Sequence, residues 1–234
     1  MWDNTHLLRG IANVLFGFSA LLLVYGVVRY VAQLPVFSLQ AVVLTANPQR
    51  VDVGQLEDVV RNQVRGNFFT VDLAGTRAAF QQLPWVRSVS VRRKFPWQLE
   101  VQIEEHVALA RWNRAALVNI HGEVFEASSD EKLPEFSGEQ ENSLVVTRMY
   151  GELEQELMPM QRRIAQLDLS PRMTWHVKLD DGMELALGRE AMRERLARFV
   201  KVYPYSVAVR MPNARRVDLR YRNGFAVQLP QGAA

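Results

Sequence analysis

Acidic residues are the side chains in this sequence whose type best suits catalysis. Glu104, Glu105 and Glu123 could in principle supply the two carboxylates with which a glycosidase protonates and attacks a sugar linkage. Glu104, however, belongs to a strongly charged alternating segment, where acidic side chains need no catalytic explanation. Because the pattern is not specific to a hydrolase, we expect that this protein is not an enzyme.

Metal and cofactor chemistry has even less support in the sequence. No two of the four histidines have the spacing of metal ligands on a helix or hairpin. These histidines are His6, His106, His121 and His176. There is no Gly-rich phosphate loop and no nucleophile-elbow serine. The absence of cysteine excludes disulfides and cysteine nucleophiles, and leaves the redox compartment open. We therefore expect no metal and no cofactor.

The 234 residues carry a formal net charge of only +3, but the charges are unevenly distributed. Residues 123–156 hold ten acidic and two basic side chains, whereas residues 189–222 hold ten basic and three acidic ones. Such blocks are mostly solvated faces of one domain. The basic residues that begin the second block are interleaved with Glu190 and Glu194 and lack stacking aromatics, so we expect no nucleic-acid binding.

An apolar run near the N-terminus predicts a membrane anchor. The run covers residues 11–28, and a helix that continues to Pro35 is long enough to cross a hydrocarbon layer of about 30 Å. A cleaved signal peptide and a buried core helix are the alternatives, but the run is longer than a signal core and apolar on all sides. We assign residues 1–10 to a tail and residues 11–34 to a transmembrane helix. Basic residues at both ends leave its orientation undecided.

Two period-two runs on either side of Phe95-Pro96 predict an antiparallel β-hairpin. Apolar residues alternate with polar ones in both runs, so one face is expected to be buried and the other wet. On the wet face, we expect Arg92 and Glu100 to lie opposite each other. This hairpin completes one predicted domain and leads directly into a second.

The predicted first domain covers residues 35–106. A strand is expected over residues 37–44, a turn at Asn47-Pro48, and two helices with Asp52 and Asp72 as their N-caps. With the hairpin, the order is strand, helix, helix, strand, strand. This order predicts a three-stranded sheet with two helices on one face, which belongs to the α+β class.

The predicted second domain covers residues 107–234 and is mainly antiparallel β-sheet with helices. Alternating runs predict strands at 107–112, 117–120, 124–125, 164–169, 175–179, 184–187, 217–221 and 225–229. Amphipathic patterns predict helices at 146–157 and 192–203. Loops are expected at 128–139 and 204–213, and the last five residues are expected to be frayed.

The last predicted hairpin carries a binding signal. Asn223-Gly224 is typical of a two-residue turn between antiparallel strands. A strand that ends a sheet offers free N–H and C=O groups to an incoming strand. Arg220, Tyr221 and Phe225 are residue types that are common at protein interfaces. The alternative is an edge that its own arginines protect from pairing, and the residues do not decide between the two.

A series of short motifs runs along the two predicted domains. The motifs are Leu83-Pro84-Trp85-Val86, Val89-Ser90-Val91-Arg92-Arg93, Pro96, Ala110-Arg111-Trp112-Asn113, Arg172 with Trp175, Leu187-Gly188-Arg189, Arg198-Phe199, and Val217-Asp218-Leu219-Arg220-Tyr221 followed by Asn223-Gly224. No single motif is decisive, but their order and spacing together are specific. In these motifs the sequence resembles the FtsQ/DivIB family of bacterial cell-division proteins, and the resemblance extends from the apolar helix to the C-terminus.

The resemblance implies a single-pass inner-membrane protein with a cytoplasmic N-terminus, a periplasmic body and enrichment at the division septum. It implies that the first domain is a POTRA domain and that the second is the family's β domain. It also implies a non-enzymatic scaffold of the divisome, which regulates septal peptidoglycan synthesis through its partners.

The resemblance further implies that FtsB adds a strand at the last strand of the β domain, with FtsL bound alongside and other divisome proteins as further partners. Carried onto this sequence, the partner surface consists of Arg172, Arg220 and Tyr221, together with Asn223, Gly224 and Phe225 of the last hairpin.

The sequence departs from the family pattern in two places. Ala46-Asn47-Pro48 stands where many members have a glycine, so this turn is expected to differ, and the N-terminal tail is short. Two rival hypotheses stay open at this point: a POTRA-type chaperone that holds unfolded clients, and an anchored cell-wall hydrolase.

Overall fold

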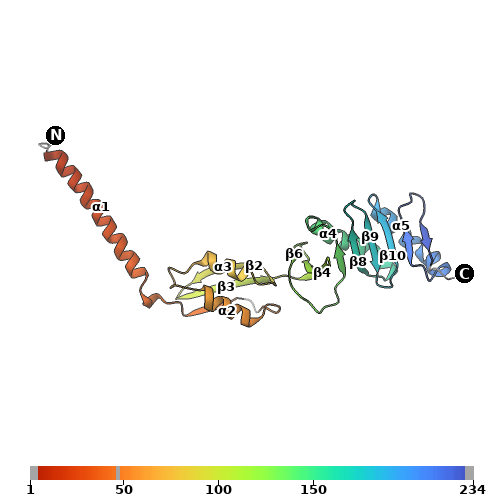
Figure 1. Ribbon diagram of the computed structural model, residues 1–234, viewed down its shortest axis with the longest axis horizontal. Helices are drawn as coiled ribbons and strands as arrows, with labels where there is room; N and C mark the ends of the chain where they lie inside the picture. Colours follow the sequence, from red (N-terminus) through yellow and green to blue (C-terminus); the bar gives the residue numbers. More distant parts are fainter. Residues whose placement is uncertain (1–4, 46–47, 230–234) are drawn as a thin grey trace. The chain divides into compact units, whose positions relative to one another are not determined.

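The computed structural model describes residues 5–45 and 48–229, and the chain divides between Glu105 and His106 into two compact units (Figure 1). Each unit has its own hydrophobic core. The predicted turn at Asn47-Pro48 lies partly outside the described residues, and the predicted frayed end, residues 230–234, lies entirely outside them.

The N-terminal unit begins with a long apolar helix, α1 (Thr5–Ala32). Its segment Arg9–Ala32 has a mean hydropathy of 2.2, and among the described residues it is the one helix long and apolar enough to cross a membrane. Its described side chains are almost all exposed. Pro35 then opens a short 3₁₀ turn, η1 (Pro35–Phe37), because its ring fixes φ and it donates no backbone hydrogen bond.

The rest of this unit has the predicted order of strand, helix, helix, strand, strand. The elements are β1 (Ala41–Leu44), α2 (Val53–Gln63), α3 (Leu73–Gln81), β2 (Val86–Lys94) and β3 (Gln98–Glu105). β3 is the central strand, antiparallel to β2 and parallel to β1. Arg92 lies opposite Glu100 and forms an ion pair with it, as the alternation predicts.

The helices α2 and α3 contact each other, and apolar side chains of both share one core with the sheet. Phe80 of α3 and Leu99 and Val101 of β3 have no measurable exposure, and Leu56 of α2 is 2% exposed. The Asp72 carboxylate accepts hydrogen bonds from two N–H groups in the first turn of α3, which confirms its predicted N-cap role.

Two predictions for this unit are wrong. The first strand does not begin at Phe37, because the 3₁₀ turn directs Phe37 toward other aromatic rings and pairing with β3 starts only at Ala41. Asp52 precedes α2 but its side chain makes no capping hydrogen bond. Here the chain is held instead by the Glu105 carboxylate, which accepts hydrogen bonds from three backbone N–H groups of residues 49–51.

The C-terminal unit alternates strands with helices. Its longer elements are β4 (Ala108–Trp112), β5 (Ala116–Asn119), α4 (Ser143–Leu157), β8 (Ile164–Leu169), β9 (Trp175–Leu179), β10 (Glu184–Gly188) and α5 (Met192–Val202). Its shorter elements are β6 (Val124–Phe125), β7 (Glu135–Ser137), η2 (Gln140–Asn142), η3 (Met158–Met160), η4 (Tyr203–Tyr205), α6 (Val207–Arg210), β11 (Arg216–Asp218) and β12 (Ala226–Gln228).

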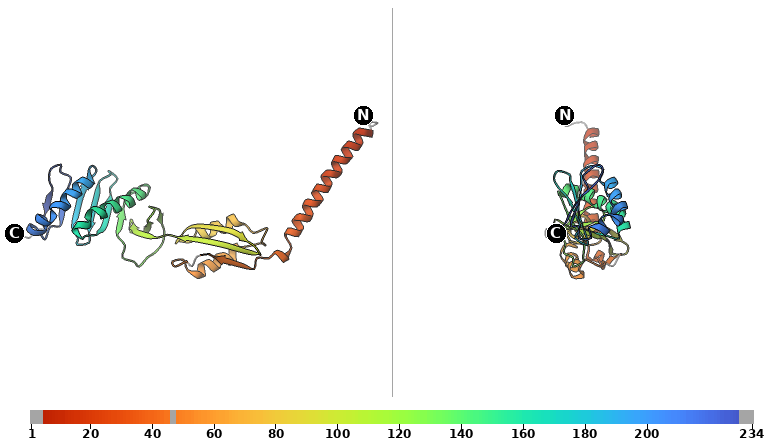
Figure 2. Two further views of the ribbon diagram at one scale, coloured as in Figure 1. Left: turned by 180° about the vertical axis from the view of Figure 1, so that it is seen from behind. Right: turned by 90° about the vertical axis from the view of Figure 1, so that its right-hand side faces the viewer.

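All nine described strands of this unit form one sheet in the order β12-β11-β10-β9-β8-β7-β4-β5-β6. Most neighbours are antiparallel, but β7 is parallel to both β4 and β8, and β11 is parallel to β10. The helices α4 and α5 contact each other and cover one face of the sheet (Figure 2, left). The core lies between these two helices and the sheet, and it includes Phe136, Leu167 and Phe199.

Two predicted loops of this unit contain regular structure. The segment 128–139 includes β7, which joins the β4 hairpin to the rest of the sheet. Its three residues are too few to show a period, and its pairing partners are distant in sequence. The segment 204–213 includes the single-turn helix α6 and part of η4.

The predicted two-residue turn at Asn223-Gly224 is also wrong. β11 pairs with β12 in the register Arg216 with Gln228 and Asp218 with Ala226, which leaves residues 219–225 as the connection. Leu219 donates its N–H to the Ala186 carbonyl of β10, so the chain follows β10 rather than turning back at Asn223.

We predict that Glu105 stabilises segment 49–51 only while it is ionised. Its burial raises the pKa, but three backbone hydrogen bonds and the Arg50 charge together bring the pKa below the ordinary 4.5. Because the pKa is lowered in the folded state, this stabilisation is present above about pH 4.5 and is lost as the pH falls through the lower value.

The change Glu105→Gln should reduce hydrogen-exchange protection of the amides of residues 49–51 at pH 7 roughly tenfold, which corresponds to about 1.4 kcal/mol. Glu57→Gln, on an exposed position of α2, is the matched control and should leave this protection unchanged. Equal protection in both variants would contradict the assignment.

Candidate functional site

The edge of the nine-stranded sheet is the best candidate for a binding site. β12 is the last strand of the sheet and pairs with β11 on one side. On its other side, no strand of residues 5–45 or 48–229 pairs with it. An edge strand of this kind presents unpaired N–H and C=O groups, which are a template for an added strand.

The parallel pairing of β10 with β11 determines which loops lie beside this edge. Leu169 pairs with Trp175, Trp175 pairs with Gly188, and Asp218 pairs with Ala186. The β8–β9 turn, the end of β10 and the loop 219–225 therefore lie at the same end of the sheet. The structure thus brings Arg172 to the same end as Arg220 and Tyr221, although Arg172 precedes Arg220 by 48 positions in the sequence.

Arg220 is held in place by its neighbour Asp218. Its Nε lies 2.9 and 3.0 Å from the two carboxylate oxygens, its Nη2 lies 2.6 Å from Oδ2, and its backbone N–H also donates to Oδ1. The hydrogen bonds from the Arg220 side chain hold the pKa of Asp218 below its ordinary value, against the opposing effect of partial burial. Asp218 therefore stays ionised and keeps the arginine oriented.

Gly188 allows Arg220 to lie against the sheet. Its φ of +81° is in the left-handed region, where residues with a side chain are strained. A Cβ at this position would be 3.1 Å from Cγ of Arg220. The aliphatic part of Arg220 therefore packs on the bare backbone at the end of β10.

The loop 219–225 is attached at its far end by Phe225. Phe225 is half-buried, and its ring packs edge-to-face on Phe199 of α5 with centroids 5.2 Å apart. The guanidinium of Arg198, also on α5, donates to the backbone carbonyl of Arg222. These contacts fix the second half of the loop against α5.

The tip of the loop is exposed. Tyr221 is 57% exposed, and Asn223 and Gly224 are exposed beside it. Arg172 is exposed in the β8–β9 turn, which is closed by hydrogen bonds between Ser170 and Thr174. Exposed arginine and tyrosine on ordered loops next to an open edge are typical of a protein-binding surface.

Three residues of this site have roles that sequence reasoning did not assign: Asp218, Gly188 and Arg198. Their roles depend on contacts with the loop that form only when β11 docks on β10. A local signal exists for Gly188 alone, since a glycine that follows a strand often marks a left-handed residue.

The three acidic residues considered for catalysis have structural partners. Glu104 pairs with Arg87 at 2.6 Å, and Glu105 binds the backbone of residues 49–51. Glu123 accepts a hydrogen bond of 2.6 Å from the buried Asn119. Among the described residues, no group of three or more His, Asp or Glu side chains could hold a metal ion.

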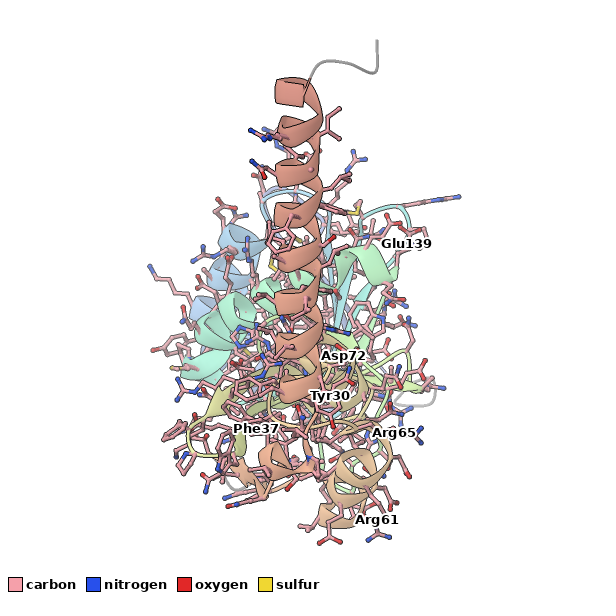
Figure 3. The ribbon with its side chains drawn as sticks, turned by 90° about the vertical axis from the view of Figure 1, so that its left-hand side faces the viewer. Tyr30, Phe37, Arg61, Arg65, Asp72 and Glu139 are labelled. Carbon is pink, nitrogen blue, oxygen red and sulfur yellow. The ribbon has the colours of Figure 1, made fainter. Side chains whose placement is uncertain are left out.

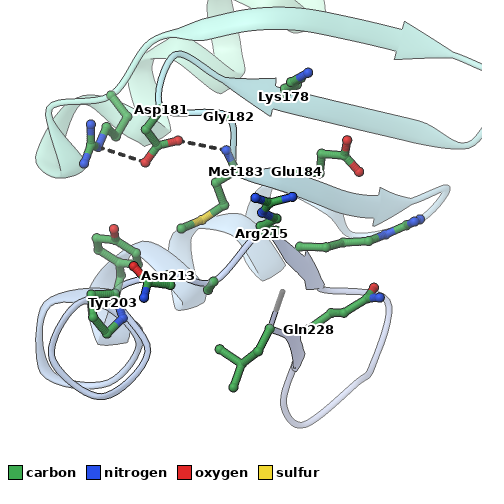
Figure 4. A pocket seen from close by; sticks show the side chains of 14 residues that line it. Lys178, Asp181, Gly182, Met183, Glu184, Tyr203, Asn213, Arg215 and Gln228 are labelled. Carbon is green, nitrogen blue, oxygen red and sulfur yellow. Dashed lines mark hydrogen bonds and ion pairs between the residues drawn. The ribbon is translucent and has the colours of Figure 1, made fainter. Parts of the chain in front are cut away.

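A cleft of about 1200 Å³ opens at the opposite end of the same strands. Figure 4 shows its walls, where Arg162 pairs with Asp181 and Asp181 accepts the N–H of Met183. Lys178 and Glu184 add charges of both signs. Small-molecule sites are mostly apolar, and this charged, mixed lining does not have that character.

Comparison with known proteins agrees with the two-unit architecture. Residues 37–106 match the family "POTRA domain, FtsQ-type", and residues 110–220 match "Cell division protein FtsQ/DivIB, C-terminal". The chain is 40% identical to the cell division protein FtsQ of Nitrosospira multiformis, over 97% of this chain and 99% of the relative. The chain belongs to the FtsQ/DivIB family.

Other FtsQ proteins show the same relation. The identity is 35% with FtsQ of Burkholderia pseudomallei and 34% with FtsQ of Bordetella pertussis, over 97% and 98% of this chain and 94% and 93% of these relatives. The chain is therefore a cell division protein with an N-terminal apolar helix, a POTRA domain and a mostly sheet domain. FtsQ/DivIB is not a known enzyme family.

We predict that Phe225 holds the loop 219–225 in place and that Tyr221 does not. Phe225→Ala should lower the free energy of unfolding of the C-terminal unit by about 1–3 kcal/mol, less than a fully buried phenylalanine would, because part of the ring is exposed. Tyr221→Ala should change it by less than about 0.5 kcal/mol.

The measurement is hydrogen exchange of the β10 amides across a urea series, which reports unfolding of this unit separately from the POTRA domain. Equal losses in the two variants would show that the exposed tyrosine also supports the loop, contrary to the geometry.

Proposed function

We propose that this protein is a non-enzymatic cell-division scaffold with one membrane-spanning helix. In this proposal α1 anchors the chain in the inner membrane, with the N-terminus in the cytoplasm and both domains in the periplasm at the septum. The sheet domain binds FtsB by strand addition at β12, with FtsL alongside. The complex links further divisome proteins to septal peptidoglycan synthesis.

The single observation that carries the proposal is the open edge of β12 beside an exposed, ordered loop. Backbone groups of an edge strand give affinity for any extended segment, whereas side chains beside the strand give selectivity. Tyr221, at 57% exposure, is available to pack on an apolar side chain of the added segment. The site therefore suits a strand that carries an aromatic or aliphatic anchor.

Charge at this end of the sheet favours an acidic partner segment. Arg172 and Arg220 lie at the same end, and Arg222 is exposed in the loop between Tyr221 and Asn223. Asp218 engages Nε and Nη2 of Arg220, so within the described part of the chain Nη1 remains for a carboxylate of the partner. Complementary charges of this kind mainly determine the register and the choice of partner.

Membrane anchoring strengthens such an interaction without further contacts. A partner that is anchored in the same membrane is confined to the same thin layer, so its effective concentration near β12 is high. A modest periplasmic interface is then sufficient for a lasting complex.

The test is a titration of the purified chain in nanodiscs with a synthetic periplasmic segment of FtsB. Tyr221→Ala and Arg220→Glu should each weaken binding by about 2 kcal/mol or more, which is roughly thirtyfold, because both belong to residue types that dominate interface energies.

The matched controls are Tyr205→Ala and Arg210→Glu, which remove an exposed tyrosine and an exposed arginine elsewhere in the same unit. They should leave the affinity unchanged. Binding should also protect the β12 amides from hydrogen exchange. Wild-type affinity in the Tyr221 and Arg220 variants, or unprotected β12 amides in the complex, would refute the docking mode.

A further inference from the structure

Five aromatic side chains from three separate segments meet at one end of the POTRA domain. This aromatic cluster consists of Phe37, Phe68, Phe69, Phe95 and Trp97. Phe37 follows α1, Phe68 and Phe69 lie between α2 and α3, and the other two form the β2–β3 turn. The ring centroid of Phe37 lies 5.1 Å from that of Phe69 and 5.2 Å from that of Trp97. The ring centroid of Phe68 lies 5.3 Å from that of Phe69 and 5.4 Å from that of Trp97.

The aromatic cluster is only partly buried by the rest of its domain, because Phe37, Phe68 and Trp97 are half-buried and the other two rings are exposed. Phe95 is 77% exposed and Phe69 is 51% exposed, and Val36 beside Phe37 is 74% exposed. Large apolar side chains gathered at the surface indicate a site of contact with another apolar phase. The core of this domain is complete without them, since none of the five belongs to it.

Hydrogen bonds tie the aromatic cluster to the end of α1. The buried side chain of Asn67 donates to the carbonyl of Ala32, the last residue of the helix, at 2.6 Å, and also to the carbonyl of Leu34. The N–H of Phe68 donates to the carbonyl of Phe37 at 2.9 Å. The aromatic cluster therefore lies at the level where the apolar helix ends, and Figure 3 looks onto this end, with Phe37 and Arg65 labelled.

The positions of these rings are held by Arg93. Its guanidinium donates to the backbone carbonyls of Phe68, Phe69 and Val71, and so joins the β2–β3 turn to the loop before α3. Arg65, a further basic residue, is exposed and lies close to Phe68 and Phe69 in sequence. Aromatic rings flanked by basic side chains are the composition of the membrane–water interface, where lipid phosphates accept hydrogen bonds and aromatic rings pack among the headgroups.

We propose that the aromatic cluster binds the surface of the bilayer in which α1 is anchored, with Phe69 and Phe95 inserted among the lipid headgroups. The inference rests on the membrane anchoring in the proposed function. It assigns the occupant as lipid because the surface continues directly from the apolar helix. The POTRA domain is then held against the membrane by a second contact besides the chain itself.

The absence of cysteine makes a depth measurement direct, because a single introduced cysteine is the only thiol. Lys94→Cys places a fluorescent label next to the aromatic cluster without removing a ring. Val24→Cys labels the apolar segment of α1, and Glu57→Cys labels an exposed position on α2 of the same domain. Each labelled full-length chain is reconstituted into vesicles that carry a nitroxide either near the headgroups or deep in the acyl chains.

The label at Val24 should lose most of its fluorescence with the deep nitroxide. The label at Lys94 should lose most of its fluorescence with the shallow one, as expected for a contact about 5–10 Å into the interface. The label at Glu57 should be unaffected by both. Adding Phe95→Asp to the Lys94→Cys chain should abolish most of the shallow quenching, while the chain labelled at Val24 with the same change stays quenched.

Three outcomes would overturn the inference while leaving the anchor in place. The Lys94 label could be as insensitive as the Glu57 label, it could stay quenched after Phe95→Asp, or it could be shielded from both lipid nitroxides and aqueous iodide. The second would mean that proximity to the anchor alone explains the quenching, and the third that protein covers the surface. An unquenched label at Val24 would instead refute the anchor, and with it the proposed function.

Discussion

Backbone pairing in one open sheet is the constraint on which the C-terminal domain depends. Each strand satisfies its neighbour's N–H and C=O groups, so the sheet must end in strands that are paired on one side only. In this domain one of those ends is β12, and three residues of it pair with β11. A short edge strand of this kind limits pairing with arbitrary chains, and selectivity then depends on the side chains beside it.

The change from antiparallel to parallel pairing at β11 determines which side chains lie beside β12. A parallel β11 must enter the sheet at the same end as β10, and the connection through α5, η4 and α6 supplies the necessary crossover. The loop after β11 therefore emerges beside Gly188 and the β8–β9 turn. Phe225 then packs on α5, and Asp218 orients Arg220, which leaves Tyr221 exposed on an ordered loop.

The POTRA domain depends in a similar way on its central strand β3. β3 pairs with both neighbours, and its apolar side chains form the centre of the core. Its charged residues have partners: Glu100 with Arg92, and Glu105 with the backbone before α2. The opposite end of the hairpin carries the aromatic cluster, so one pair of strands connects the core of the domain to the end of the apolar helix.

Much of the architecture follows from local patterns in the sequence. The β2–β3 register with Arg92 opposite Glu100, the N-cap Asp72 and the apolar α1 all depend on residues close in the chain. The family resemblance also placed Arg172, Arg220 and Tyr221 on one surface, and the structure brings these three to the same end of the sheet.

The remaining features were decided only by the tertiary structure. The three-residue strand β7, the parallel pairing of β11 and the seven-residue loop in place of a turn at Asn223-Gly224 have no local signal. Periodicity reports which side of an element is buried, and it does so within a few residues. Which strand a segment pairs with is decided by backbone hydrogen bonds and core contacts between distant residues, and these exist only once the chain has folded.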